Sequence, residues 1–139
     1  MKKFLVLGII TLLLYSCDTT VFERETTQWT FVELEAKPAD WQEYVDNDGK
    51  NRYYSCSYNV HEIDYEIYDY GAVLCYVDLN GAQQIMPYVR HYEDTNGAQW
   101  TRTVDFEYSR GKVNIFVTNS DFVVDPPAET MYFRLVLIY

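Results

Sequence analysis

The chain has 139 residues, with 21 acidic and 11 basic side chains and a formal charge of −10. This charge disfavours nucleic acid and anionic lipid surfaces as partners, and it leaves neutral polymers, cations, basic proteins or further subunits. Aromatic residues make up 17% of the chain. Such residues suit a pleated, half-buried surface, so the composition predicts an all-β fold.

The N-terminus has the pattern of a bacterial lipoprotein signal. Two lysines precede an apolar run over residues 4–14, which is about half the roughly 20 residues that a membrane-spanning helix needs. The order Leu14-Tyr15-Ser16-Cys17 resembles a lipobox, with Tyr15 bulkier than is usual. We therefore expect a signal peptide over residues 1–16 and acyl chains on Cys17, which would anchor the protein in a membrane. The alternative is an ordinary secretory signal that leaves Cys17 free.

The remaining chain is expected to form a short tether and one domain. Cleavage after Ser16 removes two lysines and no acidic residue, so the formal charge becomes −12. Residues 17–27 are polar and lack periodicity, which predicts a lipid-anchored tether. Residues 28–139 have the length of a single domain.

Several segments in the domain have the composition or the alternation typical of strands, and residues 71–79 are apolar at both parities, as in a strand covered on both sides. They cover residues 29–35, 52–60, 71–79, 83–92, 100–118 and 131–139. Asn80-Gly81 and Arg110-Gly111 predict two-residue hairpin turns. Pro87 cannot donate a backbone hydrogen bond, so it predicts an edge or a bulge. This spacing predicts an antiparallel β-sandwich of about seven or eight strands.

One segment, residues 59–71, fits two structures. Ile63, Ile67 and Tyr70 follow helical spacing, with Asn59 as a candidate cap and Gly71 as a residue that ends helices. The same isoleucines also alternate with acidic residues, as in a strand. The helical pattern is favoured, which predicts one short helix near residues 60–70.

Motifs between residues 60 and 138 resemble those of small secreted lipoproteins of Gram-negative gut anaerobes. The matching residues are Gly71, Val73 and Tyr76; Met86, Pro87 and Tyr88; Tyr108, Ser109, Gly111, Lys112 and Val113; Ser120 and Asp121; and Phe133 and Arg134. The resemblance implies a lipid-anchored β-sandwich and brings no activity with it. Cys75 stands where those proteins more usually have an aliphatic residue, so a disulfide there would not be a shared feature.

No catalytic constellation or cofactor motif is present in the sequence. Neither His61 nor His91 lies in a nucleophile or zinc-binding pattern, so we expect a non-enzymatic protein with no cofactor. The stretch "DNDGKN" resembles part of a calcium loop, with Asp46 and Asp48 as weak candidate ligands. Two of the strongest ligands of such a loop are absent, so a turn is the favoured interpretation.

The sequence leaves open whether two cysteines form a disulfide and which residue pairs with Arg134. Cys56 and Cys75 could face the core from neighbouring strands and form a disulfide worth about 3 kcal/mol, although buried free thiols are favoured. Arg134 interrupts the last apolar strand. Because a lone buried charge is costly, we expect an ion pair with a residue such as Asp121 or Asp105, and an anion-binding role is the alternative.

The tryptophans are the best sequence-level candidates for ligand binding. Trp41, Trp29 and Trp100 could form an aromatic platform for sugar rings, with Trp41 in the least strand-like context. Core packing is the alternative for each.

These features predict a lipid-anchored cell-envelope protein, expected at the outer membrane on its periplasmic face or at the cell surface. Its expected role is to bind a glycan or a protein partner. The alternative is a structural subunit of a fimbria-like or surface-layer assembly, because the last strand could pair with another subunit's sheet. An inhibitor or immunity-type protein would also suit a small acidic domain.

Overall fold

The computed structural model describes residues 26–139. The predicted signal peptide, Cys17 and the tether up to residue 25 lie outside these residues. Within them, nine strands form two antiparallel sheets, and a short helix connects the sheets. The predicted all-β sandwich with one short helix is therefore confirmed.

The smaller sheet has four strands in the order β1-β9-β4-β5. Its strands are β1 (Trp29–Ala36), β9 (Met131–Ile138), β4 (Ala72–Leu79) and β5 (Ala82–Ile85). Strand β9 is bonded to β1 on one side and to β4 on the other. The last strand therefore completes its own sheet, which removes the argument that it is free to pair with another subunit.

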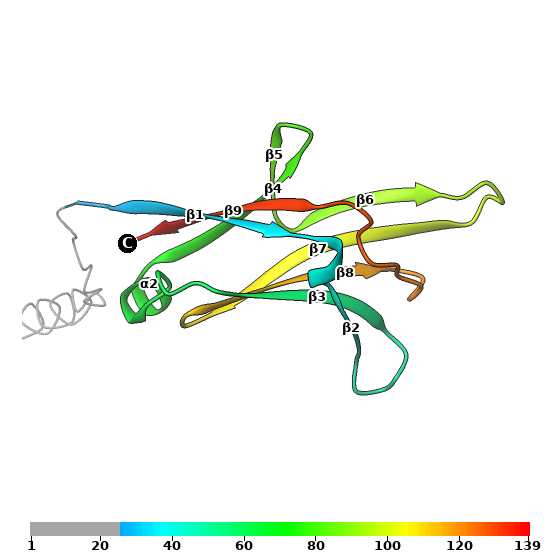
Figure 1. Ribbon diagram of the computed structural model, residues 1–139, viewed down its shortest axis with the longest axis horizontal. Helices are drawn as coiled ribbons and strands as arrows, with labels where there is room; N and C mark the ends of the chain where they lie inside the picture. The colour runs from blue at the N-terminus through cyan, green and yellow to red at the C-terminus, as the bar shows by residue number, and fades with distance from the viewer. Residues whose placement is uncertain (1–25) are drawn as a thin grey trace, which may run out of the picture.

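The larger sheet has five strands in the order β2-β3-β8-β7-β6. Its strands are β2 (Gln42–Val45), β3 (Arg52–Asn59), β8 (Lys112–Asn119), β7 (Gln99–Ser109) and β6 (Tyr88–Glu93). A 3-10 turn, η1 (Pro38–Asp40), leads into β2. Figure 1 shows the β6–β7 tip at the end of the molecule opposite the start of β1.

The strand predicted over residues 83–92 is wrong as a single element. Its first half is β5, in the smaller sheet, and its second half is β6, in the larger one. The chain changes sheets at Pro87, which lies between the two strands. Both β5 and β6 are edge strands, as the proline predicted.

The helix α2 (Tyr65–Tyr70) begins later than its predicted cap. Asp64, rather than Asn59, is the N-cap, and its side chain accepts a hydrogen bond from the Ile67 amide at 2.9 Å. Asn59 is instead the last residue of β3. Gly71 ends the helix as predicted, and a Cβ there would collide with the Ile138 carbonyl oxygen.

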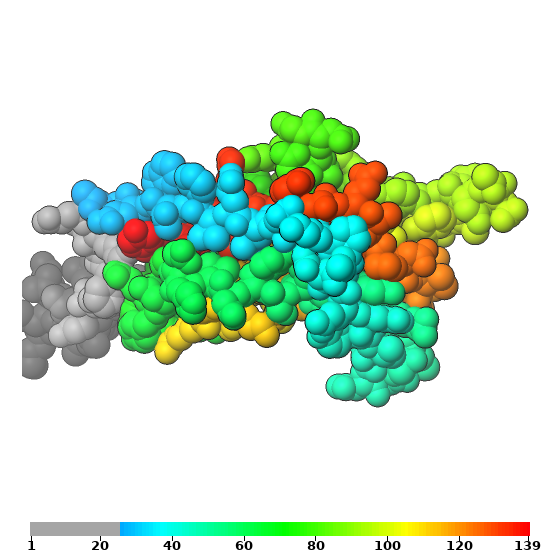
Figure 2. Space-filling model, viewed as in Figure 1, coloured from blue at the N-terminus to red at the C-terminus, as the bar shows by residue number. Residues whose placement is uncertain are grey.

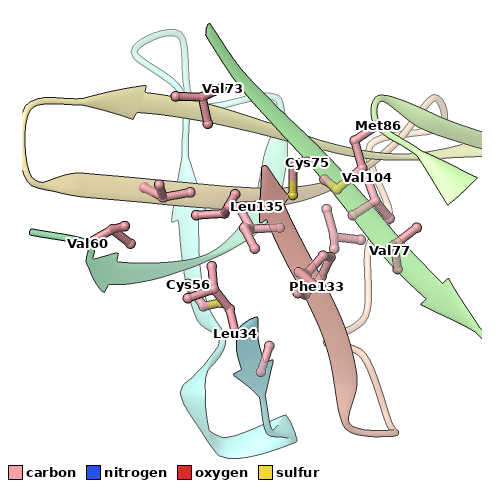
Figure 3. Packing of buried hydrophobic residues seen from close by; sticks show 14 of the residues in the cluster. Leu34, Cys56, Val60, Val73, Cys75, Val77, Met86, Val104, Phe133 and Leu135 are labelled. Atoms are coloured by element: carbon pink, nitrogen blue, oxygen red, sulfur yellow. The ribbon is translucent and has the colours of Figure 1, made fainter. Parts of the chain in front are cut away.

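The core lies between the two sheets and is mostly aliphatic. Inward side chains alternate along each strand, for example Val73, Cys75 and Val77 on β4 (Figure 3). Leu135 from the central strand β9 is fully buried among them. This packing holds the sheets face to face.

Cys56 and Cys75 are buried free thiols. They lie on β3 and β4, which belong to opposite sheets, so the expectation of neighbouring strands was wrong (Figure 3). The Cys56 thiol donates to the Tyr58 hydroxyl at 3.2 Å. Burial raises the pKa of Cys75 to about 12 and also raises the pKa of Cys56. Both thiols should therefore be protonated and unreactive at neutral pH.

Alkylation in a Cys17→Ser variant tests this state of the core. Iodoacetamide at neutral pH should leave the native protein unmodified, because the thiolate is the reactive form and both sulfurs are buried. Denaturation without a reductant should then add two carbamidomethyl groups by intact mass. A denatured protein that takes up label only after reduction would instead contain a disulfide between these cysteines.

Candidate binding groove

A groove of about 420 Å³ opens between the sheets at the end of the sandwich farthest from the start of β1. The start of β9 lines the groove, and its first residue, Met131, pairs with Ala36, the last residue of β1. The groove therefore lies at the end of the sandwich where β1 finishes. The lining residues come from β6, β7 and β8, from the end of β4 and the β4–β5 turn, and from the start of β9 and the segment before it: Asp78, Leu79, Asn80, Tyr88, Tyr92, Arg102, Val104, Val117, Pro127, Glu129, Thr130, Met131 and Tyr132.

The floor of the groove is the inner face of the five-stranded sheet. Tyr88 pairs with Val104 across the β6–β7 ladder, Arg90 with Arg102, and Tyr92 with Trp100. Because Val104 points into the core, strand alternation places all these side chains on the inner face. Toward the tip this face carries aromatic and basic groups in place of aliphatic ones. In the space-filling view the yellow-green β6–β7 tip projects beyond the rest of the molecule (Figure 2).

Two tyrosines and a tryptophan supply the aromatic surface. The Tyr92 ring stacks on Trp100 with centroids 5.7 Å apart and an interplanar angle of 14°. Tyr92 remains 40% exposed. Burial raises its pKa, the neighbouring Tyr88 raises it further, and the charges of Arg102 and Arg90 act in the opposite direction. The hydroxyl is therefore a neutral group that can donate or accept a hydrogen bond.

Two arginines lie over these rings. The Arg90 guanidinium is 5.0 Å from the centre of the Tyr88 ring, and that of Arg102 is 5.9 Å from the centre of the Tyr92 ring. Arg102 Nε also donates to Asn119 Oδ1 at 3.1 Å. The amide of Asn119 in turn donates to the Val123 carbonyl at 2.7 Å, so this buried side chain fixes both Arg102 and the segment after β8.

The walls add two carboxylates. Asp78 comes from the end of β4, and one of its oxygens accepts a hydrogen bond from the Gly81 amide at 2.8 Å within the β4–β5 turn. Glu129 comes from the segment that precedes β9. The groove thus combines aromatic faces, guanidinium donors and carboxylate acceptors, which is the composition of a site that orients a polar ring compound.

A second surface, the outer face of the four-stranded sheet, is unusually apolar. Phe31 pairs with Val136, which pairs with Leu74, and all three point away from the core. Trp29 and Phe31 are 67% and 52% exposed. The outer face of the five-stranded sheet is mostly polar, with threonines and acidic residues along β7. Strand alternation decides which side chains face outward in both sheets, but it does not decide whether they are polar. The apolar outer face therefore needs an explanation other than the fold.

The structure separates the three tryptophans that the sequence proposed as one platform. Trp41 follows η1 and is only 6% exposed within the core cluster, so its assignment as the best exposed platform is wrong. Trp29 lies on the apolar outer face, and Trp100 lies beside the groove under Tyr92. Of the three, only Trp100 is near the groove.

Arg134 has a different partner from those predicted. Its guanidinium pairs with Glu33 at 2.7 Å and lies 5.4 Å from the centre of the Phe31 ring. Asp105 and Asp121 were the expected partners, but both belong to the other side of the sandwich, on β7 and just after β8. Glu33 is directly opposite Arg134 across the β1–β9 ladder, a pairing that becomes visible only once the strand order is known.

Asp46 and Asp48 organise a turn between β2 and β3. Asp46 Oδ1 accepts from the Lys50 and Asn51 amides, each at 3.3 Å, and Asp48 Oδ1 accepts from Lys50 at 3.1 Å. A hydrogen bond between the two carboxyls lowers the pKa of Asp46 and raises that of Asp48. Among the described residues no three His, Cys, Asp or Glu side chains are grouped as metal ligands would be.

Sequence reasoning missed Tyr88, Arg90, Tyr92 and Arg102. A signal was available: in "YVRHY" the two tyrosines and Arg90 share one parity, so a strand would place them on one face. Whether that face was covered or open depended on the length of the opposite sheet. The sequence pattern does not contain that information.

Comparison of the chain with models of protein families, with curated proteins and with solved structures finds no match. Over residues 26–139, no helix has the length and hydropathy that crossing a membrane requires.

Proposed function

We propose that this protein is a lipid-anchored binding module of the cell envelope and that it holds a glycan in the groove. The observation that carries the proposal is the Tyr92–Trp100 stack beside a groove of about 420 Å³ with polar groups on its floor and walls. Ligand sites are typically aromatic-lined hollows with a few placed polar groups. A sugar ring presents a C–H face to such a stack and hydroxyls to the surrounding donors and acceptors.

A binding role is favoured over a catalytic one. His91 hydrogen-bonds Thr101 at 2.9 Å and has the opposite parity to Tyr92, so it points away from the groove. One oxygen of the Asp78 carboxylate accepts a hydrogen bond from the Gly81 amide within its turn, and among the described residues this carboxylate has no hydrogen bond to a nucleophilic side chain. The groove therefore offers groups that position a ligand, without a base placed beside a nucleophile.

The position of the groove suits an anchored protein. The first described residues lead into β1 at one end of the sandwich, and the β6–β7 tip lies at the other (Figure 1). The groove is lined by residues of β6 and β7 on the side of that tip. Acyl chains on Cys17 would hold the first end at the membrane, so the groove would point away from the lipid. We propose the outer membrane as the site of attachment, on its periplasmic face or at the cell surface.

The alternative function, a subunit of a surface assembly, has one observation in its favour. The outer face of the four-stranded sheet exposes Trp29 and Phe31 next to Val136 and Leu74. Contiguous apolar patches of this kind are typical of contacts between proteins. A second copy of the chain could cover this face while the groove stays open.

Lipid anchoring is tested by metabolic labelling with an alkyne fatty acid. The wild-type protein should be labelled and should fractionate with membranes, whereas Cys17→Ser should be unlabelled, because the sulfur that carries the diacylglycerol is lost. Cys56→Ala is the matched control and should be labelled normally. Equal labelling of the Cys17→Ser variant would place the lipid elsewhere.

The groove is tested by a glycan array probed with the Cys17→Ser protein. Tyr92→Ala should lose any glycan bound by the parent, because it removes the stacked face. Tyr44→Ala is the control: Tyr44 is 44% exposed and stacks on Tyr53 at 5.6 Å, but it lies on β2, outside the groove. An array on which the parent binds nothing, or equal binding by both variants, would count against the groove as a glycan site.

The assembly alternative predicts self-association of the Cys17→Ser protein in sedimentation velocity. Phe31→Glu should give monomers, because it places a charge in the apolar face. Val89→Glu changes a residue of similar exposure on the other sheet and should leave the association unchanged. A parent protein that stays monomeric at every concentration would remove this function.

A further inference from the structure

We infer that the groove recognises a saccharide that carries a carboxylate. The carboxylate would lie between Arg102, which lines the groove, and Arg90, which lies beside the groove opposite Arg102 on β6, with the sugar ring against Tyr92. This inference builds on the proposed glycan-binding function and names the class of ligand.

The two arginines stand out because they are unpaired in an acidic protein. In the described part of the chain, Arg52, Arg110 and Arg134 each form an ion pair, at 3.3, 2.7 and 2.7 Å. Arg90 and Arg102 form none there, although the chain has 21 acidic residues. Their charges are therefore not neutralised by the protein.

The strand register places these two charges directly opposite each other. Arg90 pairs with Arg102 across the β6–β7 ladder, on the inner face of the sheet. Like charges at such positions repel and destabilise a sheet. An anion between the two guanidiniums would attract both of them and offset their repulsion. The pair of arginines is therefore electrostatically more stable with an anionic ligand bound than without one.

The arginines are also held in position for bidentate binding. The Nε–H of Arg102 is used by Asn119, which leaves the terminal nitrogens of its guanidinium available. Arg90 is supported by the Tyr88 ring at 5.0 Å. A planar carboxylate matches the fork of a guanidinium, and charge-assisted bonds of this type are stronger than neutral ones.

The acidic walls favour a saccharide over an acidic peptide. Asp78 and Glu129 line the same groove as Arg102 and would repel a densely charged ligand. The same carboxylates can accept hydrogen bonds from sugar hydroxyls. Tyr92 is 40% exposed beside Trp100 and Arg102, so the open part of its ring and its hydroxyl can contact the sugar. One carboxylate per ring, flanked by hydroxyls, fits this distribution of charge.

Isothermal titration of the Cys17→Ser chain tests the inference. The probes are tetramers of galacturonate, glucuronate and mannuronate and their methyl esters, which keep the ring but lose the charge. At least one acid form should bind, its methyl ester should bind at least about tenfold more weakly, which corresponds to about 1.4 kcal/mol, and added salt should weaken binding. A hexaglutamate peptide is the probe for an acidic protein partner.

Arg90→Gln and Arg102→Gln should each weaken binding of the acid form by about tenfold or more. Arg52→Gln removes the same charge at a residue that does not line the groove and that pairs with Glu43, so this variant should bind normally. Arg90→Gln should also unfold at an equal or higher temperature than the parent, because it relieves the repulsion. A merely structural arginine would instead lower the unfolding temperature, and Arg90→Gln keeps the test valid if Arg102→Gln fails to fold.

Three other outcomes would overturn the inference, and each would do so in a distinct way. If the methyl esters bind as tightly as the acids and the arginine variants bind normally, the groove is a glycan site without anion recognition, and the proposed function survives. If only hexaglutamate binds, the arginines serve an acidic protein and the glycan function fails. If no probe binds and the glycan array is also empty, both proposals fail.

Discussion

The constraint on which this structure depends is strand alternation on the inner face of the five-stranded sheet. Where the four-stranded sheet covers it, that face presents Val104, Val113, Ile115 and Val117, all nearly or fully buried. Toward the β6–β7 tip the same face carries tyrosines and arginines and borders the groove. One periodic pattern therefore builds both the core and the candidate site, and the extent of the opposite sheet divides them.

The groove contains residues that favour ligand binding at a cost to the stability of the fold. Arg90 opposite Arg102 is an unfavourable pair for the sheet, and Asn119 is buried to hold one of them. The aliphatic core and the antiparallel ladders between β7 and β8 supply the stability that tolerates this arrangement. The apolar outer face of the other sheet is a separate departure from the usual pattern, so the sandwich offers two surfaces with different chemistry.

The sequence predicted well those features that depend on residues close together in the chain. Period-2 patterns identified most strands, Asn80-Gly81 and Arg110-Gly111 identified turns, and Gly71 identified the end of the helix. It failed where the outcome depended on which strands meet. The Glu33–Arg134 pair, the placement of the two cysteines on opposite sheets and the burial of Trp41 all follow from sheet order, which no local pattern contains. The groove was missed for the same reason.

The central claim is that the groove at the β6–β7 end is where this protein meets its ligand. The most direct measurement is a ¹H–¹⁵N NMR titration of the Cys17→Ser chain with the uronate tetramer that binds most tightly. The account predicts that amide shifts change at Arg90, Tyr92 and Arg102 and along residues 127–132, with little change near Phe31. Changes confined to the outer face around Phe31 and Val136 would contradict it.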